Sequence, residues 1–184
     1  MRIVAGELRG RRLTAPAGRD TRPTADRVRE AVFAIVGPVG GWAVLDLFAG
    51  SGAMGLEALS RGAASATLVD RSSAAVAALR ANVAALGLGD RARIVARDWR
   101  AAVAAERAAG RAYDLIICDP PYTLLGRIAG HLGPALAPLV SARGTLVVEG
   151  AARAPLPTEL PPLHPTSRTD RTYGDTAVSV LRLP

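Results

Sequence analysis

The chain has 184 residues and a mass of 19.0 kDa, a length typical of one domain with a buried core. A hydrophobic content of 49% and a mean hydropathy of +0.21 exclude a disordered chain, and no apolar string is long enough to cross a membrane. The single cysteine, Cys118, cannot form an intrachain disulfide, and the first ten residues lack the apolar stretch of a signal peptide. We therefore expect a globular cytoplasmic protein.

Positive charge is concentrated at the start of the chain. All 23 basic residues are arginine, and the formal net charge is +7. Residues 1–29 hold eight of these arginines against three acidic residues, so this segment alone contributes +5. Because arginine binds phosphate through two parallel hydrogen bonds and stacks on bases, this pattern indicates a polyanionic partner. A basic surface that serves only solubility is the alternative.

The first elements in chain order are a hairpin and a helix. Residues 2–14 alternate apolar and polar side chains around two glycines, which predicts a short β-hairpin. A loop follows, and Thr24 is then a candidate N-cap for a helix that ends before Gly37. We expect residues 1–23 to form a basic arm and residues 24–184 to form the main domain. The apolar face of the helix is predicted to comprise Val28, Val32, Ile35 and Val36.

From residue 43 onward, strand and helix patterns alternate with short connections. Repeated strand–helix–strand units imply a parallel sheet covered by helices on both faces. Beyond residue 163 the pattern predicts a terminal antiparallel hairpin, whose clearest strand starts at Thr176. The predicted strands are 43–48, 66–70, 92–96, 113–118 and 144–149, and the predicted helices lie near 53–61, 73–86, 99–109 and 124–139.

The tetrapeptide Asp119-Pro120-Pro121-Tyr122 directly follows the apolar strand that ends at Cys118. In an open α/β sheet, ligands bind outside the carboxyl ends of the strands. The prolines stiffen the backbone and lack N–H groups, so carbonyl acceptors lie beside a carboxylate and an aromatic ring. This pattern predicts a rigid site for a flat ligand that carries an amino group. A purely structural turn is the alternative.

A glycine turn follows the first predicted strand. Gly50 and Gly52 allow a tight turn, and the next helix presents N–H groups at its start. Asp70 lies 20 residues after Gly50 at the end of the second strand, where a carboxylate accepts hydrogen bonds from a ribose. This spacing also fits a dinucleotide-binding fingerprint. Asp46 argues against a dinucleotide, because a carboxylate inside this strand suits a cationic amino-acid group.

Asp98 and Trp99 follow the third predicted strand. The Asp98 carboxylate can accept a hydrogen bond from the exocyclic amine of an adenine, or it can cap the following helix, and the two roles are compatible. Arg22 and Arg27 flank the start of the first helix, where they could bind phosphate, help to close a cofactor pocket, or simply be solvated. Neither of the two histidines has ligand neighbours, so no metal site is expected.

Together these motifs resemble those of class I S-adenosylmethionine-dependent methyltransferases. The Asp-Pro-Pro-Tyr form is similar to that of enzymes that methylate exocyclic amino groups of nucleobases. Segments 2–13, 22–30, 55–62 and 171–176 resemble the RsmD family, the bacterial 16S rRNA guanine-N2 methyltransferases. The likeness covers nearly the whole chain, apart from residues 150–165. The family often has phenylalanine where this chain has tyrosine in the tetrapeptide.

The resemblance implies a Rossmann-like α/β fold with a mainly parallel seven-stranded sheet flanked by helices, a C-terminal antiparallel hairpin and an N-terminal β-hairpin arm. It implies S-adenosyl-L-methionine as cofactor and 16S rRNA as partner. The limited recognition apparatus favours a small-subunit ribosomal particle over naked rRNA as the substrate and we expect a monomer, but the sequence decides neither the form of the substrate nor the oligomeric state. The implied catalytic residues are Asp119, Pro120, Pro121 and Tyr122; the cofactor-binding residues are Asp46, Phe48, Gly50, Ser51, Gly52, Asp70, Asp98 and Trp99; the RNA-binding residues are Arg2, Arg9, Arg11, Arg12, Arg22 and Arg27.

The implied reaction is methylation of a guanine N2 atom on a base turned out of its RNA context. A DNA adenine-N6 methyltransferase is the nearest rival, but such enzymes generally carry a target-recognition domain for which this chain has no room. A protein glutamine methyltransferase would have asparagine at position 119. An NAD-dependent oxidoreductase leaves the tetrapeptide unexplained, and a non-catalytic RNA-binding module explains only the charge. The residues alone do not distinguish guanine from adenine.

Overall fold

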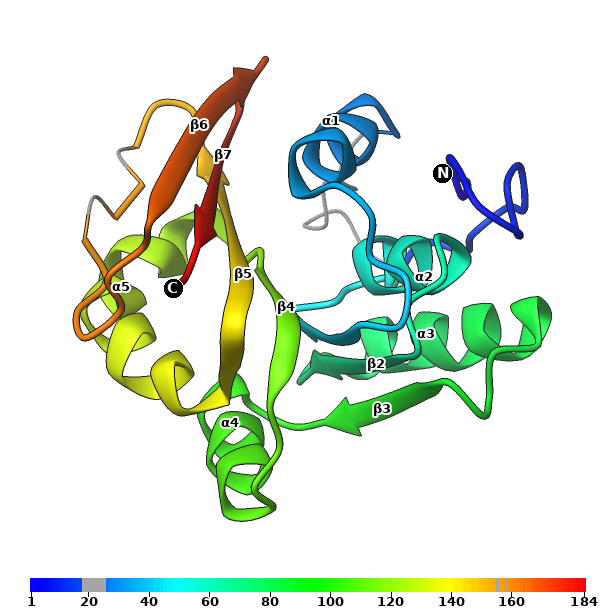
Figure 1. Cartoon of the computed structure of the whole chain (residues 1–184). Coiled ribbons are helices and arrows are strands. Elements are labelled where there is room, and N and C mark those ends of the chain that lie inside the picture. The colour runs from blue at the N-terminus through cyan, green and yellow to red at the C-terminus, as the bar shows by residue number, and fades with distance from the viewer. Residues whose placement is uncertain (18–25, 155, 158) are drawn as a thin grey trace.

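A seven-stranded sheet with the strand order β3-β2-β1-β4-β5-β7-β6 forms the frame of the computed structural model (Figure 1). The structure describes residues 1–17, 26–154, 156, 157 and 159–184, with the side chain of Tyr122 left out. The elements are α1 (Asp26–Val36), β1 (Ala43–Leu47), α2 (Ala53–Ser60), β2 (Ser65–Asp70), α3 (Ser73–Leu86), β3 (Ala92–Ala96), α4 (Trp99–Ala108), β4 (Tyr113–Cys118), α5 (Tyr122–Leu136), η1 (Ala137–Leu139), β5 (Val140–Ala151), β6 (Ser167–Tyr173) and β7 (Thr176–Arg182).

The strand order contains a topological switch between β1 and β4. The chain runs from β1 through β2 to β3, and then crosses back to place β4 on the other side of β1. All pairings among β1 to β5 are parallel, whereas β7 pairs antiparallel with both β5 and β6. The carboxyl ends of β1 and β4 therefore meet at the point where α/β proteins bind ligands. The predicted mainly parallel sheet with a C-terminal antiparallel hairpin is confirmed.

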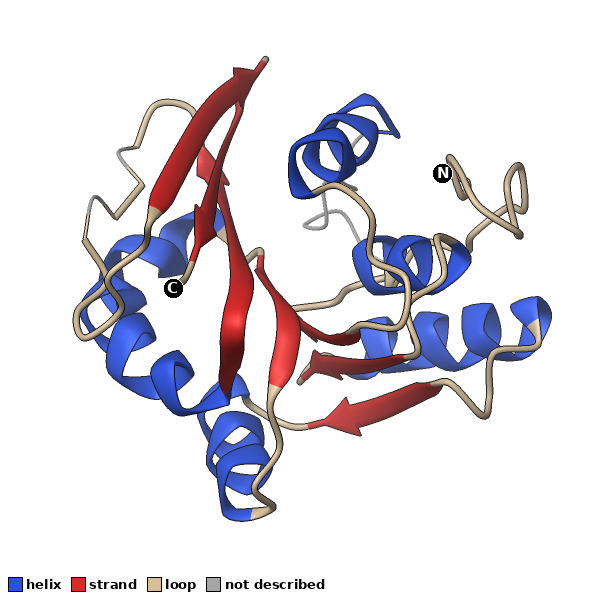
Figure 2. Cartoon of the chain, viewed as in Figure 1, coloured by secondary structure: helices blue, strands red, loops and turns tan. Residues whose placement is uncertain are grey.

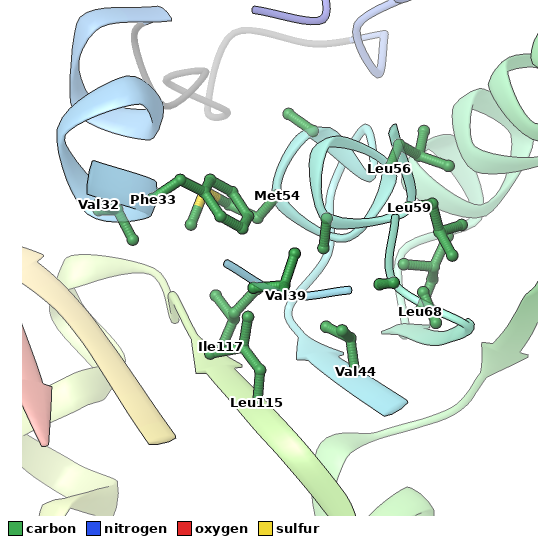
Figure 3. Packing of buried hydrophobic residues seen from close by; sticks show 14 of the residues in the cluster. Val32, Phe33, Val39, Val44, Met54, Leu56, Leu59, Leu68, Leu115 and Ile117 are labelled. Atoms are coloured by element: carbon green, nitrogen blue, oxygen red, sulfur yellow. The ribbon is translucent and has the colours of Figure 1, made fainter. Parts of the chain in front are cut away.

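Helices cover both faces of the sheet, with α1, α2 and α3 on one face and α4 and α5 on the other (Figures 1 and 2). Successive strand residues point to opposite faces, so Val44 of β1 joins the first core and Leu45 joins the second. Figure 3 shows side chains of α1, α2, β1 and β4 converging in the first core. Because helices bury both faces of the sheet, the central strands such as β4 are almost continuously apolar.

The predicted element boundaries hold closely, with local corrections. Strand β5 begins at Val140 rather than at residue 144. Its first residue, Val140, pairs with Tyr113 of β4, and the register then shifts so that Leu115 pairs with Thr145. Helix α5 begins at Tyr122 rather than residue 124, because Pro121 occupies the N-cap position and already fixes its backbone. The Thr24 cap lies outside the described residues.

The face of α1 was partly mispredicted. Val28, Val32 and Val36 are buried as expected, but Phe33 is buried in place of the half-buried Ile35. Arg29 is also fully buried, where its guanidinium donates to the Asp26 carboxylate at 2.8 Å and to the backbone carbonyl of Arg2. Apolar periodicity misses such a residue, because a charged side chain is buried only where partners from elsewhere satisfy it.

The N-terminal segment folds back on itself as predicted, as a narrow loop with one isolated bridge rather than a regular hairpin. Residues 18–23 of the predicted basic arm lie outside the described residues, and from here on we use the name arm for residues 1–14. Arg2 and Arg12 form an isolated antiparallel bridge, and the Ile3 N–H donates to the Arg11 carbonyl at 2.9 Å. Gly6 has a φ of +84°, and a Cβ atom there would lie 1.8 Å from the Ser60 carbonyl oxygen. Only glycine permits this approach of the arm to α2.

Glu57 of α2 fastens the arm to the main domain. Its fully buried carboxylate accepts the N–H groups of Val4 at 2.7 Å and Ala5 at 2.9 Å, and it pairs with Arg61 at 2.8 Å. Ser60 adds a hydrogen bond from the Leu8 N–H at 3.0 Å. These bonds satisfy backbone donors that would otherwise be left unpaired where the arm covers the helix.

No helix in the described part of the chain is long and apolar enough to span a membrane.

Replacing Glu57 by alanine should destabilise the protein, because two arm N–H groups and one guanidinium lose their acceptor. We expect the free energy of unfolding in urea to fall by about 2–3 kcal/mol. Trypsin should then cut after the arm arginines much faster than in the wild type. Glu30→Ala, which removes an exposed glutamate of α1, is the control and should change stability by less than about 0.5 kcal/mol. Equal effects of the two variants would contradict this role of Glu57.

Candidate active site

Three carboxylates gather at the carboxyl edge of the central strands. Asp46 lies in β1, Asp70 ends β2, and Asp119 directly follows β4. The register places Leu47 opposite Cys118, and the Asp119 N–H donates to the Leu47 carbonyl at 3.4 Å. The negative charges of Asp119 and Asp70 both act on Asp46. The edge therefore has an excess of negative charge, which suits a cationic ligand.

The turn between β1 and α2 is shaped by left-handed backbone. Gly50 and Gly52 have φ values of +57° and +81°, which glycine adopts at little cost. Phe48 has a φ of +65°, which is uncommon for an aromatic residue and stores strain at the start of the turn. A Cβ atom on Gly52 would lie 2.7 Å from Leu79 Cδ2, whereas one on Gly50 would meet only the Phe48 carbonyl, at 4.0 Å. Gly52 thus permits packing against α3, and Gly50 leaves open space.

Asp46 holds the start of α2 against β1. Its Oδ2 accepts the Gly55 N–H at 2.9 Å, and the side chain is 2% exposed. Burial raises the pKa of Asp46 to about 7; the Gly55 hydrogen bond opposes this shift, and the charges of Asp119 and Asp70 reinforce it. The carboxylate is therefore destabilised until a positive charge lies nearby.

Asp70 joins the glycine turn to the start of α3. Its Oδ2 accepts the Gly50 N–H at 2.9 Å, and its Oδ1 accepts the Ser72 N–H at 2.9 Å. A carboxylate offers about four acceptor positions, so these bonds leave room for two more. The half-buried carboxylate is thus held in a fixed orientation and can still accept hydrogen bonds from the two hydroxyls of a ribose.

Asp98 caps α4, as one of the two sequence interpretations proposed. Its carboxylate accepts the Arg100 N–H at 3.0 Å and lies 3.8 Å from Arg71. The Trp99 side chain is 3% exposed and belongs to the second core, with its ring centroid 6.3 Å from that of Phe48. Phe48 is half-buried and offers a ring surface between the glycine turn and α4. The two rings form a tilted pair with an interplanar angle of 47°.

The tetrapeptide after β4 turns the chain into α5. Asp119 is half-buried, Pro120 is buried and Pro121 is exposed. The Pro121 carbonyl accepts the Leu124 N–H at 2.7 Å, so it serves the helix, whereas the proposed contact to an amino group falls to Asp119 and the Pro120 carbonyl. The Tyr122 side chain lies outside the described part of the structure. Burial and the charge of Asp119 raise the pKa of the neighbouring Cys118 thiol, so Cys118 is not a nucleophile.

The candidate RNA-binding arginines differ in their surroundings. Arg2 forms an exposed ion pair with Asp26 at 3.4 Å, and Arg11 donates to the Ala85 carbonyl near the end of α3 at 2.6 Å. Arg9, Arg12 and Arg27 are exposed and form no ion pair with another described residue. Arg22 lies outside the described residues. A hollow of about 440 Å³ between the arm and α1 is lined by Arg2, Ile3, Val4, Ala5, Arg9, Gly10, Asp26, Arg27 and Glu30.

Two buried polar residues near the site were not anticipated from the sequence, Glu57 and Asn82. Both interrupt apolar or alanine-rich helices, in which a buried polar side chain requires hydrogen-bond partners from other segments. Among the described residues, no group of three histidine, cysteine or acidic side chains could hold a metal ion.

The family described as Conserved hypothetical protein 95 matches residues 1–182. The chain is 35% identical over 189 residues to YlbH of Bacillus subtilis, whose name assigns it to the rRNA methyltransferases; the match covers 99% of this chain and 98% of that protein. It is 44% identical over 123 residues to ribosomal RNA small subunit methyltransferase D of Escherichia coli, covering 66% of this chain and 60% of that protein.

A solved structure is similar to this chain over its whole length. A hypothetical protein of Thermus thermophilus superposes with a TM-score of 0.82 at 34% identity, covering 100% of this chain and 99% of that protein.

Replacing Asp46 by asparagine should change how stability depends on pH. The pKa of Asp46 is about 7 in the folded protein, against the ordinary value of 3.8. Between these two pH values the folded protein therefore keeps a proton on this carboxyl group that the unfolded chain has lost. Wild-type stability should therefore fall between about pH 4 and pH 7, relative to the variant, by about 2–4 kcal/mol. Urea unfolding of both proteins across this range measures the difference. Parallel curves would show that Asp46 does not titrate in this way.

Proposed function

Because the chain belongs to the RsmD family of S-adenosylmethionine-dependent methyltransferases, we propose that it methylates the exocyclic N2 atom of a specific guanine in 16S rRNA. The observation that carries this proposal is the position of Asp119 and Pro120. They directly follow β4, beside the glycine turn and the Asp46 carboxylate, at the switch point of the sheet. An acceptor pair for an amino group thus adjoins a site suited to a cationic cofactor.

S-adenosyl-L-methionine is the cofactor, and it supplies an electrophilic methyl group on a positively charged sulfur. The residues present fit it. The open space at Gly50 leaves room above the turn, and Asp70 is oriented to accept hydrogen bonds from a ribose. The negative charge shared by Asp46, Asp70 and Asp119 suits the sulfonium and ammonium groups. We assign the half-buried Phe48 ring to one side of the adenine, and the chain at Asp98 and Trp99 to its edge.

The acceptor nitrogen requires help from the protein. The lone pair of a guanine N2 atom is delocalised into the ring, so the amine is a weak nucleophile. Hydrogen bonds from its two hydrogens to the Asp119 carboxylate and the Pro120 carbonyl favour a nitrogen whose lone pair points at the methyl group. This is catalysis by orientation and electrostatic complementarity. The proton lost from nitrogen passes to Asp119 or to water, and Tyr122 stacks on the base.

The RNA substrate is supported by the arm and by the relatives. Both YlbH and the Escherichia coli enzyme are named as acting on rRNA. The exposed Arg9, Arg12 and Arg27 are available for phosphate contacts, and Arg9 and Arg27 line the hollow between the arm and α1. We expect a small-subunit ribosomal particle to present the base to a monomeric cytoplasmic enzyme.

Replacing Asp119 by alanine should abolish methyl transfer while leaving cofactor affinity nearly intact. We expect the rate of methyl transfer to fall at least about 100-fold, because the Asp119 carboxylate no longer accepts a hydrogen bond from the amino group in the transition state. The assay uses small ribosomal subunits from cells that lack the gene, with calorimetry for the cofactor. Asp90→Ala, an exposed acidic residue between α3 and β3, is the control. Retained activity in the Asp119 variant would remove this residue from the site, and N6-methyladenosine as product would favour the adenine rival.

Replacing Arg9, Arg12 and Arg27 by glutamine should weaken RNA binding and flatten its salt dependence. If all three contact phosphates, the slope of log affinity against log salt should fall by about 2–3. Filter binding between low and moderate salt measures it. Arg107→Gln and Arg143→Gln are matched controls, because these exposed arginines lie where α4 ends and β5 begins, away from the carboxyl edge. An unchanged slope in the triple variant would assign these three charges to solubility.

A further inference from the structure

One buried side chain of α3, Asn82, contacts both the arm and the glycine turn. Its Nδ2 donates to the Thr14 carbonyl and to the Ser51 carbonyl, each at 2.9 Å. Its Oδ1 accepts the Thr14 N–H at 2.8 Å. Asn82 is 2% exposed, so both N–H groups and the oxygen of its amide are engaged away from solvent. The side chain thus links the last residue of the arm to the middle residue of the turn.

The other end of the arm reaches the same turn. The Ser51 hydroxyl lies 3.5 Å from the sulfur of Met1. Arg11 adds a hydrogen bond to the carbonyl of Ala85, three residues after Asn82 on the same helix. Both ends of the arm therefore meet Ser51, one directly and one through Asn82.

The helix itself does not need an asparagine at this position. Helix α3 is capped by Ser72 at its start and by left-handed Gly87 at its end. The neighbouring buried positions of its face are apolar, among them Leu79, Val83 and Leu86. A buried amide costs stability unless all its hydrogen bonds are made, and here every partner lies outside α3. The function of this residue is thus to connect two segments.

We propose that Asn82 is a positioning residue that couples RNA binding on the arm to cofactor binding at the glycine turn. The inference rests on the proposed function, since it requires RNA phosphates at Arg9 and Arg12. Bound phosphates restrict the arm, Thr14 then holds the Asn82 amide, and the amide fixes the Ser51 carbonyl. The cofactor meets a turn that is already ordered. By linkage, each ligand raises the affinity of the other by the same factor.

Equilibrium dialysis with radiolabelled S-adenosylhomocysteine measures this factor without turnover. The dissociation constant is determined with and without saturating small ribosomal subunits from cells that lack the gene. We expect subunits to tighten binding to the wild type about fivefold or more, which is within the usual range of coupling between sites. In Asn82→Leu, which keeps the branched shape of the side chain but loses all three hydrogen bonds, the factor should fall to about one. Asn82→Ser, which is too short to reach both carbonyls, serves if the leucine variant does not fold.

Val83→Ala separates coupling from loss of stability. It destabilises the same helix at the next residue and removes no hydrogen bond to the arm or the turn. It should keep the wild-type factor. A factor of one in the wild type, or an unchanged factor in both Asn82 variants, would overturn the inference. Methylation of the same subunits by the wild type would in that case still support the proposed function. Failure of the wild type to bind or methylate the subunits would overturn both.

Discussion

The hydrogen bond between the buried Asp46 carboxylate and the Gly55 N–H is the contact on which the site depends. It joins β1 to the first turn of α2, so the glycine turn between them has fixed ends. A Cβ atom on Gly55 would lie 2.3 Å from Leu68 Cδ2, so only glycine allows the helix to lie this close. The bond offsets only part of the cost of burying a carboxylate, and the raised pKa of Asp46 expresses the remainder. A cationic cofactor would offset more of it.

The arm is part of the main domain rather than a separate attachment. Glu57 binds its backbone, Arg29 binds the carbonyl of Arg2, and Asn82 binds Thr14. These partners come from three helices on the same face of the sheet, and α2 and α3 also border the glycine turn (Figure 1). The segment proposed to bind RNA is consequently built onto the elements that form the cofactor site. Binding of one ligand can then affect the other over a short path of hydrogen bonds.

Much of the fold and of the candidate site follows from local sequence patterns. Continuous apolar strands, glycine turns and a carboxylate at the end of a strand are each visible in a short window. Arg29, Glu57 and Asn82 could not be predicted in this way, because their burial depends on backbone groups 27 to 68 residues away in the chain. The Pro121 carbonyl accepts the Leu124 N–H in the first turn of α5, a contact that depends on where the helix begins, and the catalytic role of Pro121 stays a prediction. The roles of the individual site residues remain proposals.

The central claim is that Asp119 and Pro120 present the N2 atom of a 16S rRNA guanine to the methyl group of S-adenosylmethionine. The most direct test maps methylated nucleotides by mass spectrometry in 16S rRNA from cells that lack the gene, and from the same cells supplied with the wild-type chain. The account predicts that a single N2-methylguanosine disappears in the first case and returns in the second. An identical map in both, or the loss of a methyl group from adenine, would contradict it.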